Sequence, residues 1–208
     1  AVIHNSDPSC DFTVWAPYAG QVWVRVVYPF QKELKMVKHE FGYWHARLED
    51  CQAGIRYMFK IDDKNPLPDP ASLSQPKGVH GPSEVTNLKQ YNWNDENRPS
   101  IPLNEMIFYE LHAGTFSEEQ NFEGIIRKLD YLTDLGVNAL QLMPVAQFPG
   151  KRNWGYDGVY PFAVQESYGG YQGLMDLVSA AHNKGLMVFL DVVYNHLGPE
   201  GNYLGEYG

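Results

Sequence analysis

Three short stretches of the sequence combine carboxylates, imidazoles and aromatic rings, and these residues could carry chemistry. They read YELHAGTF at 109–116, NWGYDGVY at 153–160 and DVVYNH at 191–196. Carboxylate and imidazole groups can hold or transfer protons at neutral pH. Tyrosine and tryptophan rings are common on sugar-binding surfaces, because a flat ring covers the apolar face of a pyranose while its polar edge stays wet.

Each of these residues also has a purely structural interpretation. Asp191 follows a run of large apolar residues, where a carboxylate is expensive to bury without a partner, but a lone Asp can also cap a turn. A local structural hydrogen bond is the favoured explanation of His112. Trp154 and Tyr156 could form a hydrophobic plug. Because residues of all three stretches occur together at neighbouring strand ends, a functional site is favoured over these separate structural roles.

The second half of the chain alternates strands with helices. Apolar runs predict strands at 106–111, 137–143 and 186–193, the first of them buried on both faces. Helical spacing predicts one helix over 122–132, with Asn121 as N-cap and Gly136 just past its end, and a second helix near 174–181. This alternation predicts a parallel α/β sheet or barrel, whose working residues lie at the C-terminal strand ends.

The first half has a different rhythm. Short alternating strands separated by turn residues, with no helical stretch between them, predict an antiparallel immunoglobulin-like sandwich over 1–92. Four prolines between residues 66 and 76 predict an extended, irregular segment. A polar stretch at 93–105 is the predicted linker, which leaves 106–208 as the second unit.

The second unit is too short for a complete β/α barrel. A closed barrel takes about 250 residues, whereas 106–208 offers three predicted strands. We therefore favour the first three β/α units of a TIM barrel, in a chain that stops less than halfway round, over a complete three-stranded α/β domain. The stretch 144–167 is predicted to be an irregular loop, and loops of that length are usually functional.

Composition excludes several classes of partner. A hydrophobic content of 44% and a charged content of 20% are typical of a globular protein. The net charge of −9, without a Lys/Arg cluster, argues against nucleic acid or an anionic membrane as the main partner. No apolar run approaches the roughly 20 residues that span a bilayer. No secretory leader opens the sequence, and the absence of an initial Met indicates a trimmed start.

Cys10 and Cys51 are the only cysteines. Because the sequence contains no CxxC, HExxH or Cys/His cluster, we expect no structural zinc site. Two partly buried free thiols in a cytosolic protein are the favoured interpretation, and a single disulfide is the open alternative.

Taken together, the motifs resemble glycoside hydrolase family 13, the α-amylase family. DVVYNH is similar to its first conserved region, WGYDGV at 154–159 to the segment before that region, and YELHAGTF to its first barrel strand. FTVWAP at 12–17 resembles the opening of the β-sandwich that precedes the barrel in several subfamilies. PVAQFPG at 144–150 and GPEGNYL at 198–204 are similar to the maltooligosyltrehalose trehalohydrolase subfamily.

This resemblance implies a cytoplasmic hydrolase of α-glucans that uses no cofactor. It would cleave the α-1,4 bond between trehalose and a maltooligosaccharide and retain the anomeric configuration. A glycogen branching or debranching enzyme is one alternative, and a non-catalytic glucan-binding module is another. In the binding module Trp15, Trp23, Trp44 and Trp93 would form the sugar platform, although packing in the sandwich or at its seam is favoured for them.

The resemblance also implies roles for single residues. Tyr156 would stack on the sugar at the cleavage point, His196 would hydrogen-bond its hydroxyls, and Asp191 would hold the neighbouring loop. Trp154 is a further expected substrate contact, and Asp157 and Asn195 are expected to support the site. Asn195 matches a calcium-binding position of many α-amylases, but a single match is too little for a metal site.

No catalytic residue is expected within this chain. The family's nucleophile, acid/base and third carboxylate would all follow Gly208. Retaining glycosidases need two carboxyl groups about 5 Å apart, and nothing in the spacing of Asp157 and Asp191 supports such a pair. We therefore expect that the chain alone has no glycosidase activity.

Overall fold

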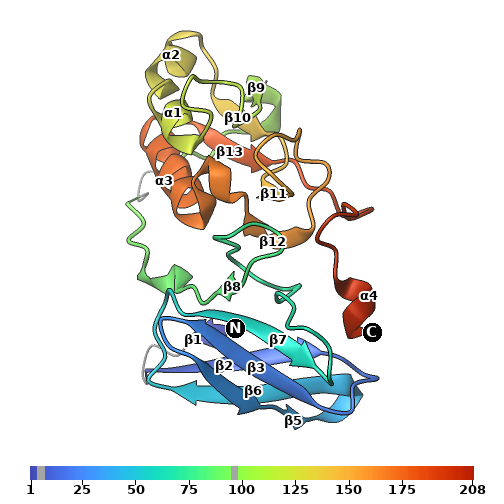
Figure 1. The fold of residues 1–208 in the computed structure, drawn as a ribbon. Helices are drawn as coiled ribbons and strands as arrows, with labels where there is room; N and C mark the ends of the chain where they lie inside the picture. The colour runs from blue at the N-terminus through green and yellow to red at the C-terminus, as the bar shows by residue number, and fades with distance from the viewer. Residues whose placement is uncertain (4–7, 95–97) are drawn as a thin grey trace.

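The protein has two parts, a β-sandwich and an α/β unit, which lie one above the other in a computed structural model (Figure 1). The structure describes residues 1–3, 8–94 and 98–208. Residues 4–7 of the predicted sandwich and 95–97 of the predicted linker lie outside these ranges. In the described ranges, no helix has the length and apolar character needed to cross a membrane.

The sandwich consists of two antiparallel four-stranded sheets, with strand orders β1-β2-β6-β5 and β4-β3-β7-β8. The strand bounds are β1 Val2–Ile3, β2 Ser9–Trp15, β3 Val22–Tyr28, β4 Lys32–Lys35, β5 Val37–Lys38, β6 Tyr43–Glu49, β7 Arg56–Ile61 and β8 Ser83–Glu84. Alternate residues of β2, β3 and β7 are buried between the sheets, as the apolar alternation predicts. The rings of Phe12 and Tyr57 meet across the two sheets, with centroids 4.8 Å apart. The expected sandwich is confirmed.

The tryptophans of the first half lie in four different places. Trp44 is buried in the core, whereas Trp15 lies on the outer face of the same sheet and is 47% exposed. Trp23 lies on the outer face of the other sheet. Trp93 contacts the ring of Tyr91, after the last sandwich strand. The hypothesis that these four rings form a single sugar platform is therefore wrong.

Cys10 and Cys51 form a disulfide, so the expectation of two free thiols is wrong. Cys10 lies on β2 and Cys51 follows β6, its antiparallel neighbour. The Cys51 amide donates to the Pro8 carbonyl at 2.7 Å, and the two cysteine Cα atoms are 5.5 Å apart, within the usual range for a bridge. This pairing depends on the register of β2 and β6, which a separation of 41 residues in the sequence does not reveal.

Three parallel strands form the sheet of the α/β unit, in the order β13-β10-β9. The strands are β9 Phe108–Leu111, β10 Ala139–Leu142 and β13 Met187–Leu190, and the helices are α1 Phe122–Ile126, α2 Leu129–Asp134, α3 Gly170–Asn183 and α4 Leu204–Tyr207. Across both parts, the described residues also form the 3₁₀ turns η1 Glu40–Gly42, η2 Leu88–Gln90, η3 Leu103–Glu105 and η4 Glu166–Tyr168. The order of strands and helices is that of the first three units of a β/α barrel.

Two details of the α/β unit differ from the sequence prediction. The helix expected over 122–132 is divided into α1 and α2, because the Lys128 amide makes a tighter bond to the Ile125 carbonyl, at 2.9 Å, three residues back. Asn121 caps α1 as expected, accepting from the Gly124 amide at 3.0 Å. The segment expected as an irregular loop contains the antiparallel pair β11 Ala146–Gln147 and β12 Tyr160–Val164.

Helices α1, α2 and α3 contribute to the apolar core on one face of the parallel sheet. The opposite face carries Phe108 and Phe189, whose ring centroids are 5.0 Å apart. Phe108 remains 42% exposed. The prediction that the first strand is buried on both faces is therefore wrong for the described residues, because a layer of helices covers only one of them.

The disulfide gives the first testable prediction. Replacing both cysteines, Cys10→Ser with Cys51→Ser, should lower the free energy of unfolding by about 4 kcal/mol, the loop-closure value for a loop of this length. Urea denaturation followed by tryptophan fluorescence measures the change. The unmodified protein, unfolded without reductant, should show no titratable thiol, and two titratable thiols would contradict the bridge.

Candidate functional site

The candidate site lies at the C-terminal edge of the parallel sheet, where three strands end at one level. Leu111, Leu142 and Leu190 lie side by side in the register of β9, β10 and β13. The ladder continues by one more step, with the Met143 amide bonded to the Leu111 carbonyl at 3.0 Å and the Asp191 amide to the Leu142 carbonyl at 2.9 Å. The residues that follow these strands therefore project from one edge.

Asp191 and Tyr156 form the centre of this site. The Tyr156 hydroxyl donates to Asp191 Oδ2 at 3.0 Å, joining the loop before β12 to the end of β13. This hydrogen bond is the main cause that raises the pKa of Tyr156, followed by desolvation and by the charges of Asp191 and Glu110. The phenol is protonated at neutral pH and donates this hydrogen bond. Asp191 thus has the partner that its position required.

His196 joins the same cluster through its ring. Its Nε2 donates to the Tyr156 carbonyl at 2.8 Å, and its Nδ1 lies 3.1 Å from Asn195 Oδ1. Four of the residues expected from the sequence, including Asp191, are therefore gathered by direct contacts. Two loops that lie far apart in the sequence thus bring these residues into contact.

The loop that carries Tyr156 is folded tightly around Asn153. The side-chain oxygen of Asn153 accepts from the Gly155 amide at 2.8 Å, and its amide nitrogen donates to Asp157 Oδ2 at the same distance. Gly155 has φ +99°, and a Cβ there would lie 2.1 Å from the Pro144 carbonyl oxygen, so only glycine fits. Asp157 is thus bonded to the residue around which the loop folds.

Trp154 is 75% exposed at the tip of this loop. A hydrophobic plug would be covered by neighbouring side chains, so that alternative does not apply to Trp154. The exposed indole is instead available to a ligand.

His112 supports the Tyr156 loop from the end of β9. Its Nδ1 lies 3.1 Å from Thr115 Oγ1, and its Nε2 donates to the Asn153 carbonyl at 2.7 Å. The Tyr168 hydroxyl lies 3.0 Å from the same Nε2. Tyr168 is buried, and burial raises its pKa to about 12. The structural interpretation favoured for His112 agrees with these contacts, whereas the part played by Tyr168 had no signal in the sequence.

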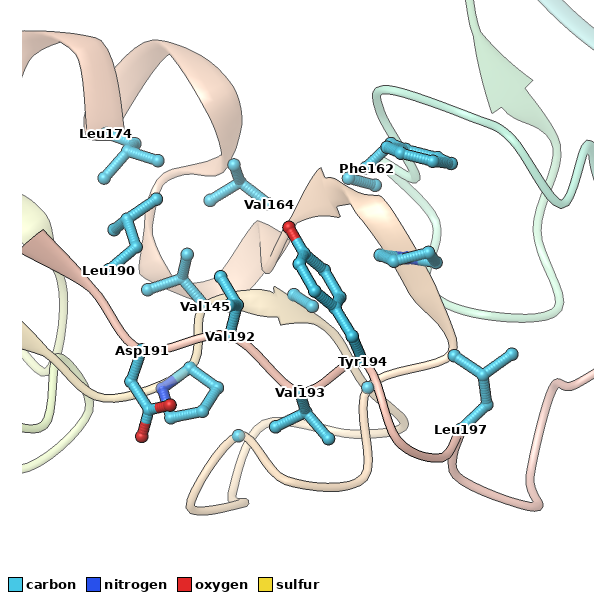
Figure 2. Close-up of a pocket in the computed structure, with 16 residues that line it drawn as sticks. Val145, Phe162, Val164, Leu174, Leu190, Asp191, Val192, Val193, Tyr194 and Leu197 are labelled. Carbon is cyan, nitrogen blue, oxygen red and sulfur yellow. The ribbon is translucent and has the colours of Figure 1, made fainter.

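An apolar cavity of about 200 Å³ lies on the other side of the chain that follows β13 (Figure 2). Leu190, Val192 and Tyr194 point toward it, whereas the Asp191 carboxylate points away. Val164 and Leu174 close its opposite wall. Apart from the Tyr194 hydroxyl, the side chains that point toward this cavity are apolar and offer no hydrogen bonds to sugar hydroxyls. The polar cluster on the opposite side of the chain is therefore the candidate site.

The described residues include no group of three or more His, Cys, Asp or Glu side chains that could hold a metal ion. Asn195, the single position that resembles a calcium ligand, bonds to His196 instead.

Comparisons with known proteins agree with this architecture. The family profile described as "Alpha amylase, catalytic domain" matches residues 94–207, which is more than half of the chain. The profile described as "Carbohydrate-binding module 48 (Isoamylase N-terminal domain)" matches residues 2–77.

Similar proteins match nearly the whole chain. A malto-oligosyltrehalose trehalohydrolase of Saccharolobus solfataricus is 49% identical over 95% of this chain and 35% of its own length. A glycogen debranching enzyme of Pectobacterium atrosepticum is 30% identical over 95% of this chain and 39% of its own length. The solved structure of a protein assigned as an alpha amylase from Salmonella typhimurium is 38% identical, with a TM-score of 0.91 over 96% of this chain and 34% of that one.

The chain thus spans about a third of the length of the relatives that it matches. The profile match, the parallel strands and the preceding sandwich all lead to the same assignment. The chain belongs to the alpha-amylase family, with a carbohydrate-binding module 48 sandwich followed by part of the catalytic domain.

Proposed function

We propose that this chain forms the N-terminal part of a glycoside hydrolase that acts on maltooligosyltrehalose. The enzyme would cleave the α-1,4 bond that joins trehalose to the maltooligosaccharide, retain the anomeric configuration and release trehalose. The observation that carries the proposal is the contact of Tyr156 with Asp191 and His196 at the C-terminal edge of the strands. The 49% identity to a trehalohydrolase, against 30% to a debranching enzyme, supports this substrate over a branched glucan.

In this proposal the aromatic residues provide the surface for the sugar. Tyr156 stacks on the glucose unit at the cleavage point, and the bond to Asp191 fixes the plane of its ring. The exposed indole of Trp154 covers a further sugar face. Nε2 of His196 is held by the Tyr156 carbonyl, so Nδ1 would exchange the Asn195 side-chain oxygen for a sugar hydroxyl.

The proposal assigns no catalytic carboxylate to this chain. A retaining glycosidase needs a nucleophile and an acid/base about 5 Å apart. Asp191 already accepts the Tyr156 hydroxyl, and Asp157 accepts the amide of Asn153, so each carboxylate has a supporting role in its own loop. The nucleophile and the acid/base are proposed to come from residues outside these 208.

We also propose that the protein works in the cytoplasm on a soluble maltooligosaccharide substrate. A disulfide is unusual in that compartment. Cys10 and Cys51 are 0% and 2% exposed, however, and a thiol that attacks a disulfide needs access to its sulfur. Burial therefore supports persistence of the bridge in a reducing environment.

The substrate assignment is tested on protein produced from the whole reading frame that contains this chain. We expect release of trehalose from maltotriosyltrehalose, measured by chromatography, and little release of reducing ends from pullulan, whose α-1,6 bonds a debranching enzyme would cleave. The isolated 208-residue chain should release no trehalose. Cleavage of pullulan without release of trehalose would reject the proposed substrate.

The Tyr156–Asp191 bond is tested by the variant Tyr156→Phe in the same whole protein. The ring remains, but the hydrogen bond to a charged acceptor is lost, so kcat/KM for trehalose release should fall by roughly 10- to 100-fold. Asp191→Asn keeps an acceptor oxygen, so its kcat/KM should fall less than that of Tyr156→Phe. Tyr131→Phe, an exposed tyrosine on α2, is the matched control and should leave kcat/KM unchanged. Equal kcat/KM of Tyr156→Phe and the wild type would contradict a role of the Tyr156–Asp191 hydrogen bond in the site.

A further inference from the structure

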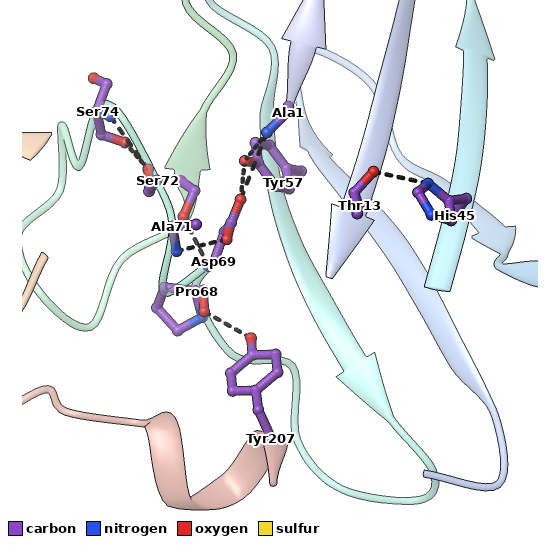
Figure 3. A network of polar contacts seen from close by, with 11 residues as sticks. Ala1, Thr13, His45, Tyr57, Pro68, Asp69, Ala71, Ser72, Ser74 and Tyr207 are labelled. Carbon is purple, nitrogen blue, oxygen red and sulfur yellow. Dashed lines mark hydrogen bonds and ion pairs between the residues drawn. The ribbon is translucent and has the colours of Figure 1, made fainter. Parts of the chain in front are cut away.

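The loop between β7 and β8 extends from the sandwich toward the α/β unit (Figure 1). A buried carboxylate holds its base: Asp69 Oδ2 accepts the Tyr57 hydroxyl at 2.6 Å, and Oδ1 accepts the Ala71 amide at 2.8 Å (Figure 3). The Asp69 amide donates to Ser83 Oγ at 2.9 Å, which ties the start of the loop to β8. These bonds attach the loop firmly to the sandwich.

The tip of this loop contacts the connection that carries Tyr156. Val79 is 3% exposed and packs in a small apolar cluster with Val159, Tyr160 and Ala163. The Tyr160 hydroxyl donates to the Val79 carbonyl at 2.7 Å. The sandwich is therefore bonded directly to the strand that begins four residues after Tyr156.

The neighbouring residue of the tip contacts the segment that follows His196. Nδ1 of His80 lies 2.6 Å from the Tyr203 hydroxyl, and its Nε2 lies 3.4 Å from Glu200 Oε1. Between these two contacts, Gly201 has φ +83°, and a Cβ there would lie 2.5 Å from the Val79 Cβ. The chain after His196 thus lies directly against the tip.

The segment that follows His196 is also held by hydrogen bonds at both of its ends. Near the site, the Gly198 amide donates to the Gly158 carbonyl at 3.0 Å, which joins the two site loops. Further along, Tyr207 is buried in the sandwich core, and its hydroxyl donates to the Pro68 carbonyl at 2.7 Å. Pro68 belongs to the β7–β8 loop as well, so one loop of the sandwich holds both site loops in place.

We infer that the β7–β8 loop of the sandwich positions the candidate site, and that His80 is a positioning residue that acts through the loop carrying His196. The sandwich then contributes to the reaction without touching the sugar. The effect of the β7–β8 loop on catalysis rests on the proposed function, whereas its effect on the loop that carries His196 does not. His80 reaches Tyr203, seven residues after His196, and Val79 supports the other loop from the same tip.

Variants of His80 and Tyr203 in the whole protein test this inference. His80→Ala and Tyr203→Phe each remove the bond between the two side chains, and each should lower kcat for trehalose release by about tenfold with little change in KM, since small displacements of a positioning group are costly. The double variant should be no worse than His80→Ala alone, because both changes break one contact. His39→Ala, a histidine between β5 and β6, is the matched control and should leave kcat unchanged.

A second cycle separates positioning from general destabilisation. In a His196→Ala background, His80→Ala should have almost no further effect on kcat, because the side chain through which it acts is gone. A full tenfold loss in that background would overturn the role of His80, and so would an unchanged kcat in the wild-type background.

Hydrogen–deuterium exchange of the whole protein provides a readout that does not need the substrate. Amides of residues 195–203 should exchange faster in His80→Ala than in the wild type, and at the wild-type rate in His39→Ala. Unchanged exchange at 195–203 would overturn the inference. If the wild type releases no trehalose, the proposed function fails, and the exchange rates still decide whether the β7–β8 loop holds the His196 loop.

Discussion

The parallel register of β9, β10 and β13 is the constraint on which the candidate site depends. Leu111, Leu142 and Leu190 share one level, so the residue after each strand emerges from the same edge. A shift of one residue in a strand would turn its side chains to the other face. Asp191 would then point into the apolar cavity instead of toward Tyr156, and its carboxylate would lack a partner.

Much of the fold could be predicted from the sequence because it depends on local patterns. Apolar and polar residues alternate along β2, β3 and β7, and this pattern indicates which side chains face a core. The near-continuous apolar runs of the later strands indicate a parallel sheet. Asn121 at the start of α1 and Gly136 after α2 act through their own backbone neighbourhood. Such local patterns can be interpreted without knowing which elements pack against one another.

Contacts between distant segments could not be predicted in the same way. The disulfide needs the register of β2 and β6, and the pair β11–β12 is too short on one side to show a period. The β7–β8 loop was predicted only as an irregular, proline-rich segment, yet its tip at Val79 and His80 touches both site loops. Nothing in the spacing of residues 79, 160 and 203 shows that they meet.

The open face of the parallel sheet carries a second carboxylate, Glu110, whose charge acts on the phenol of Tyr156. Gln141 donates to Glu110 Oε1 at 3.0 Å on this face, so the Glu110 carboxylate is held by a neutral partner. The charges of Glu110 and Asp191 both act to raise the pKa of Tyr156, after the direct hydrogen bond to Asp191 and desolvation. In the proposed complex, a sugar stacked on the ring would displace water and strengthen these interactions, because electrostatic interactions grow as the local dielectric falls. Ligand binding and the hydrogen bond that orients the ring would therefore reinforce each other.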